Sequence, residues 1–113
     1  MITYNDTHRK IVESGANRIK EVFDSKNIYL IKQILLCLDS YLDPYYQHRL
    51  PYENEVYDLL QELVVSCQDD EVIDSCLQLI GDYSCIPLTI MEQKFMNIKS
   101  SKKPNAKQIL NMR

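Results

Sequence analysis

The chain has 113 residues, 45% hydrophobic and 26% charged, with a formal net charge of −3 at pH 7, so we expect one domain with a core of its own. Two glycines and four prolines are too few for the turns of an all-β protein, so the composition predicts an all-α fold. No apolar run approaches a membrane span and the N-terminus lacks a signal-peptide pattern, so we expect a cytoplasmic protein with reduced cysteines and no membrane contact.

Hydrophobic residues at helical spacing predict a first helix over 5–24, which a polar residue at positions 5–7 can cap. Gly15 lies inside this pattern. A second helix covers 27–42 and ends before Pro44, because the residue before a proline disfavours helix. Residues 44–52 then form an extended connector that contains two prolines and three tyrosines.

The second half of the chain continues with a third helix over 53–67 and a fourth over 70–83, which Asp69 or Asp70 caps. A fifth helix opens at Pro87, in the position where proline is tolerated, and runs to about Ile98. We therefore expect a single helical domain over 1–98. The basic tail over 99–113, interrupted by Pro104, is either disordered or forms one short helix over 106–112.

An internal repeat relates "LIKQILLCLDSYLD" (30–43) to "VIDSCLQLIGDYSC" (72–85) at an offset of 42 residues. Apolar positions match along both segments, Tyr41 matches Tyr83, and a proline follows each segment. A helix-pair unit of about forty residues is typical of HEAT and armadillo repeats. The repeat therefore predicts HEAT-like pairs, about five to six helices in all, in a short solenoid or an orthogonal bundle.

Three of the four cysteines, Cys67, Cys76 and Cys85, recur at intervals of nine residues. Structural zinc sites pair their ligands two to four residues apart, and no such pair of Cys or His occurs. In the repeat, Cys37 and Cys76 align with apolar residues. We expect them to be core residues, with no metal site and no cofactor.

A catalytic constellation is also missing from the sequence pattern. There is no nucleophile elbow, no glycine-rich phosphate loop and no HExxH motif. "DDEVID" (69–74) lacks the ligands at alternate positions and the glycine that a calcium-binding loop requires, so it indicates the start of a helix. His48 in the connector reads as a surface histidine. We expect no catalytic residues and no enzyme activity.

Charge is unevenly distributed along the chain. Residues 39–92 hold twelve acidic residues against Arg49 alone, a net of −11, whereas residues 93–113 hold six basic and no acidic residues. Such an acidic block favours a basic protein partner over nucleic acid. The alternative is a solvated acidic face on which the basic tail folds back. For partner recognition, the candidate binding residues are Asp58, Glu62, Asp69, Asp70, Glu71, Asp74, Tyr46 and Tyr57.

The segments "NEVYDLLQELVVS" (54–66) and "DDEVIDSCLQLIGDY" (69–83), each with an E-V-x-D element, resemble the small all-helical, HEAT-like immunity proteins of bacterial polymorphic and contact-dependent toxin systems. The resemblance covers about residues 27–98. It implies a cytoplasmic protein, monomeric when free, that neutralises one cognate toxin domain, such as a nuclease or another toxin with a basic cleft. The other interpretation is a HEAT-like adaptor or a subunit of a larger regulatory assembly.

Overall fold

The structure, a computed structural model, describes residues 1–112 and confirms the all-α prediction: this part of the chain contains seven α-helices and no strand. Short 3-10 turns at Pro44–Tyr46, Phe95–Asn97 and Ser100–Lys102 join or extend the helices. The helices are α1 (Asp6–Glu13), α2 (Ala16–Asp24), α3 (Ile28–Leu42), α4 (Glu53–Ser66), α5 (Asp70–Tyr83), α6 (Thr89–Gln93) and α7 (Lys103–Asn111).

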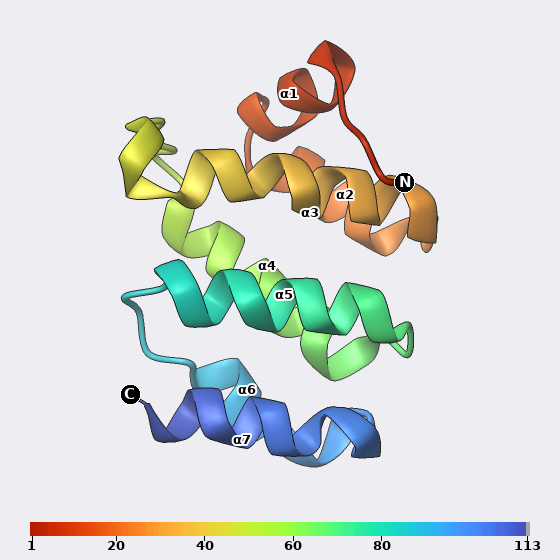
Figure 1. Cartoon of the computed structure of the whole chain (residues 1–113), viewed down its shortest axis with the longest axis vertical. Coiled ribbons are helices and arrows are strands. Elements are labelled where there is room, and N and C mark those ends of the chain that lie inside the picture. The colour runs from red at the N-terminus through yellow and green to blue at the C-terminus, as the bar shows by residue number, and fades with distance from the viewer. Residues whose placement is uncertain (113) are drawn as a thin grey trace.

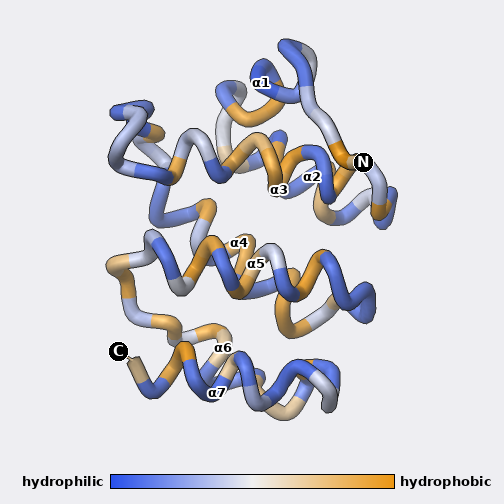
Figure 2. Tube along the Cα trace, in the orientation of Figure 1, coloured by the Kyte–Doolittle hydropathy of each residue, from blue (hydrophilic) through white to orange (hydrophobic). Residues whose placement is uncertain are grey.

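The helices form two layers. In Figure 1, α3, α5 and α7 are stacked in front, and α2, α4 and α6 lie behind them. Helix α1 packs on α3 and closes the N-terminal end of the stack. From α2 to α7 the chain alternates between the two layers, and α5 packs closely on both α3 and α4. The molecule measures 36 × 27 × 25 Å. Apolar residues recur along every helix (Figure 2), and those between the layers form a single core.

The 42-residue repeat is visible in the structure, because α3 and α5 begin 42 residues apart and lie side by side. Their caps are equivalent: the side chain of Asn27 accepts a hydrogen bond from the backbone N–H of Leu30, and Asp69 accepts one from Val72. Most of the matched apolar residues are buried in both helices, whereas Leu30, which matches Val72, is half-buried. The buried pairs include Ile31 and Ile73, Ile34 and Cys76, Leu35 and Leu77, Cys37 and Leu79, and Leu38 and Ile80.

The prediction of one helix over 5–24 is wrong, because the chain turns at Gly15. This residue has a φ of +117°, which an L-amino acid with a side chain rarely adopts. Helix α1 ends at Glu13 and α2 begins at Ala16. The apolar residues of α1 and α2 both face the same core, so their spacing continues across the break between the two helices.

The C-terminal part also differs from prediction. Of the helix expected from Pro87 to Ile98, only α6 is α-helical, and it begins two residues after Pro87. The last helix, α7, begins at Lys103, three residues before the predicted 106–112 segment. Pro104 lies in the first turn of α7, where a backbone N–H would have no partner within the helix. The missing N–H of proline therefore costs no hydrogen bond, and Pro104 begins the helix instead of interrupting it. Helix α7 packs on α5 with Ala106 buried.

Among residues 1–112, none of the helices combines the length and the apolar character needed to cross a membrane.

Candidate functional site

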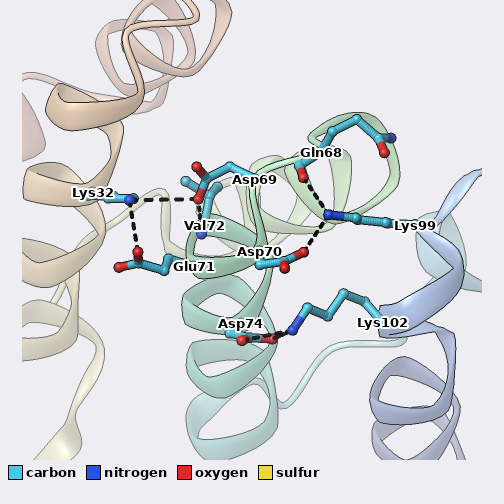
Figure 3. Close-up of polar contacts among 9 residues, drawn as sticks. All are labelled: Lys32, Gln68, Asp69, Asp70, Glu71, Val72, Asp74, Lys99 and Lys102. Atoms are coloured by element: carbon cyan, nitrogen blue, oxygen red, sulfur yellow. Dashed lines mark hydrogen bonds and ion pairs between the residues drawn. The ribbon is translucent and has the colours of Figure 1, made fainter.

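The acidic residues at the start of α5 are paired with lysines (Figure 3). Lys32 of α3 lies between Asp69 and Glu71, with nitrogen–oxygen distances of 3.7 and 3.4 Å. Asp70 is 2.6 Å from Lys99 Nζ, which also donates a hydrogen bond to the carbonyl of Gln68. The hydrogen bond from Lys99 holds the pKa of the Asp70 carboxyl below its usual value. We call Asp69, Asp70, Glu71, Asp74 and their lysines the paired edge.

The remaining pairs extend this pattern. Lys102 Nζ lies 3.0 Å from Asp74, and Lys94 Nζ lies 3.5 Å from Glu62. Five of the six acidic residues expected to bind a partner therefore have an ion pair within the chain, and Asp69 and Glu71 share one lysine, Lys32. Lys94, Lys99 and Lys102 come from the basic C-terminal segment, so that segment does fold back on the acidic residues. Within residues 1–112, Asp58 alone of the six has no ion pair.

The two tyrosines expected at a binding surface lie in different surroundings. Tyr57 is a correction to the prediction, since its side chain is only 2% exposed and belongs to the core. Tyr46 is 54% exposed, and its neighbour Tyr45 is 83% exposed. Their rings pack edge to face with centroids 5.2 Å apart. Both sit on the 3-10 turn that Pro44 begins, so these aromatic rings are held on a short, defined turn.

A second acidic cluster, which we call the carboxylate edge, lies at the opposite ends of the same helices. It comprises Asp39 and Asp43 at the end of α3, and Asp82 and Tyr83 at the end of α5. The Tyr83 hydroxyl donates a hydrogen bond of 2.8 Å to Asp39 and lies 3.5 Å from Asp43. None of the three carboxylates has an ion pair with any residue in the described range 1–112.

The electrostatics of the carboxylate edge are strongly negative. The hydrogen bond to Asp39, burial and the nearby charges of Asp39, Asp43 and Asp82 all raise the pKa of the Tyr83 hydroxyl. The C-terminal ends of α3 and α5 add partial negative charge from their unpaired carbonyls. Acidic residues are unfavourable at such a position, because their charge has the same sign as that of the helix ends.

The carboxylate edge adjoins the exposed tyrosine pair. Asp43 accepts a hydrogen bond from the backbone N–H of Tyr45 at 3.0 Å and so caps the turn that carries both rings. The sequence interpretation missed this edge because it ranked acidic residues by their density along the chain. The match of Tyr41 to Tyr83 was the available signal, since it placed both segment ends, with their aspartates, at the same side of the stack.

The residues considered for chemistry do not assemble into a reactive group. Cys37 and Cys76 are buried, as predicted, and burial raises the pKa of the Cys37 thiol to about 11. Cys67 is half-buried and Cys85 is exposed. His48 lies on the surface with its ring 5.0 Å from that of Tyr41. No three His, Cys, Asp or Glu side chains within residues 1–112 gather as metal ligands would.

The fold and its edges define a small, compact all-α protein built of stacked helices. No family model, curated protein or solved structure matches the chain.

Proposed function

We propose that this chain is an immunity-type inhibitor, without enzyme activity, that binds and neutralises a toxin domain with a basic surface. One observation carries the proposal: the carboxylate edge presents three aspartates without ion pairs next to two exposed, ordered tyrosines. The resemblance of the helical segments to immunity proteins supports the same class of partner.

The chemistry of the edge suits a protein partner rich in arginine or lysine. Asp39 is held in place by the Tyr83 hydroxyl, so one acceptor is oriented before binding. Arginine matches carboxylates with its planar set of donors and stacks on aromatic rings such as Tyr45 and Tyr46. A negative edge also accelerates encounter with a basic surface, whereas the burial of tyrosines slows dissociation. An acidic edge of this kind imitates the phosphates of a nucleic-acid substrate.

The proposal is tested by co-expression in bacteria. The toxin domain is taken from the C-terminal end of the large protein encoded immediately upstream, and growth is scored with and without this chain. Rescue of growth together with a complex on gel filtration is the expected result. A toxin that this chain neither binds nor neutralises would overturn the proposal and favour the adaptor interpretation.

Two variants with the same change in charge separate the edges. Replacing Asp39 and Asp82 by asparagine removes two charges from the carboxylate edge, and asparagine still accepts the hydrogen bond from Tyr83. The control replaces Asp70 and Asp74 by asparagine in the paired edge. We expect the first variant to lose toxin binding at physiological salt and the control to retain it. Equal loss in both variants would show that net charge, and not the carboxylate edge, governs binding.

A further inference from the structure

A groove between α3 and α5 leads along the surface to the carboxylate edge. Its volume is about 260 Å³, and it is lined by apolar and charged side chains. Leu35 and Leu79 are almost fully buried beneath it, and Leu36 on its rim is 42% exposed. Leu36 is one of the few large apolar side chains in residues 1–112 that remain open to solvent. Ile2 of the N-terminal segment also lines the groove, so the chain covers part of its apolar centre and leaves Leu36 exposed.

The two ends of the groove differ in charge. At one end Lys32 and Glu71 neutralise each other at 3.4 Å. At the other end is Asp39, which has a hydrogen bond from Tyr83 but no ion pair in the described chain. Asp82 does not line this groove but faces the one between α5 and α7, so Asp39 is the carboxylate at the acidic end. The groove is thus neutral at one end, apolar at its centre and acidic at the other end.

We propose that the groove binds a peptide segment of the partner in which an apolar side chain lies two or three residues from an arginine or lysine. This inference rests on the proposed function and specifies the partner segment. The apolar side chain fits between Leu36 and Leu79, and the basic side chain meets Asp39. The charge difference between the ends fixes this order, because a basic side chain at the Lys32 end would be repelled or would have to displace an existing ion pair.

The spacing follows from the helix. Leu36 precedes Asp39 by three residues and Asp43 by seven, so the apolar rim and the carboxylates are about 5–10 Å apart along α3. An extended peptide, at about 3.3 Å per residue, covers this distance in two or three residues. A segment with leucine and arginine directly adjacent would place one of the two side chains outside its site.

The test uses the full chain and synthetic peptides as probes. The first peptide contains the segment Leu-Gly-Ser-Arg, the second has alanine in place of the leucine, and the third has the leucine and arginine adjacent. Binding is followed by NMR, through the methyl signals of Leu36 and Leu79 and the amide signal of Asp39. We expect the first peptide to shift both sets of signals and to bind about tenfold more tightly than the other two.

A variant of the groove provides the second arm. Leu36→Ser removes the exposed apolar side chain at the rim of the groove. It should lower the affinity for the first peptide about tenfold, to that for the alanine peptide, without changing the unfolding transition. The matched control is Tyr29→Ser, since Tyr29 is 47% exposed on the same helix but does not line the groove. Equal binding of all three peptides, or no effect of Leu36→Ser, overturns the inference.

The outcomes also distinguish this inference from the proposed function. If the toxin is neutralised and its binding depends on Asp39 and Asp82 but not on Leu36, the groove inference fails and the proposed function stands. If the first peptide binds in the groove but no upstream toxin is neutralised, the inhibitor function fails while the preference of the groove for an apolar and basic segment remains.

Discussion

The hydroxyl groups of Tyr41 and Tyr83 occupy equivalent positions in the repeat, and each donates to a carboxylate on the preceding helix of its layer. Tyr41 bonds Glu13 on α1 at 2.6 Å, and Tyr83 bonds Asp39 on α3 at 2.8 Å. Replacing each tyrosine by phenylalanine removes the hydroxyl alone. The two bonds differ in surroundings, since Tyr41 is only 4% exposed whereas Tyr83 is half-buried.

The expected losses of stability follow from that difference. A hydrogen bond to a charged acceptor contributes about 1.5–3 kcal/mol, and less where water competes for both partners. We expect Tyr41→Phe to lower the free energy of unfolding by about 2 kcal/mol and Tyr83→Phe by about 0.5–1 kcal/mol. Tyr45→Phe is the control, because Tyr45 is 83% exposed, and it should change stability by less than about 0.5 kcal/mol.

The same bonds make stability depend on alkaline pH. Burial and the bond to Glu13 raise the pKa of Tyr41, and the bond to Asp39 and burial raise that of Tyr83. The folded state therefore favours the neutral phenols. Their contribution is complete below the ordinary tyrosine pKa of about 10 and is lost above it, by up to about 1.4 kcal/mol per pH unit for each tyrosine.

The assay is urea unfolding followed by circular dichroism from neutral pH to about pH 11, with tyrosinate absorbance recorded in parallel. Each phenylalanine variant should lose stability less steeply with rising pH than the parent protein. The reasoning is refuted if Tyr41→Phe is no more destabilising than Tyr45→Phe, or if its stability falls as steeply with pH as that of the parent.

Two further predictions concern polar side chains in the core. The Nδ1 atom of His8 accepts a hydrogen bond of 3.0 Å from the backbone N–H of Asn5 and completes a capping box. His8→Ala should cost about 1 kcal/mol in urea unfolding, whereas His8→Gln keeps the acceptor and most of that stability; equal loss in both would contradict the capping role. Gln61, which is fully buried, accepts a hydrogen bond from Met91 N–H at 3.2 Å, but its Nε2 atom has no partner within residues 1–112. Gln61→Met loses the hydrogen bond but also removes the unpaired Nε2, so its free energy of unfolding in thermal melts should match that of the parent within about 1 kcal/mol. Gln61→Ala leaves a cavity and should cost about 2–4 kcal/mol. A large loss in Gln61→Met would mean that the Gln61 amide is satisfied.

The repeat predicted α3 and α5 well because several features of the sequence agree at one offset. Asn27 and Asp69 are capping residues at the same offset as the apolar stripes and the matched tyrosines. The break at Gly15 was not predictable from periodicity, since both sides of the break face one core. A single glycine is tolerated inside many helices, and only its backbone conformation of φ +117° distinguishes a turn from a weak helical position.

The candidate site was harder to predict than the fold because its charges are neutralised over long distances in sequence. Lys99 and Asp70 are 29 residues apart and Lys102 and Asp74 are 28 apart, so no local pattern couples them. Tyr57 was misplaced for a related reason. On an amphipathic helix with apolar residues on several sides, composition does not decide which tyrosine faces the core.

The pairing of charges argues for the carboxylate edge as the binding surface on energetic grounds. A basic partner at the paired edge would have to displace Lys99 and Lys102, and these residues also attach the last turns and α7 to α5. At the carboxylate edge it would break no ion pair, since within residues 1–112 none is formed there. The net charge of −11 over residues 39–92 therefore overstates the acidic surface available to a partner. Under the proposed function, we expect binding to depend on the carboxylates that have no internal partner and lie beside exposed aromatic rings.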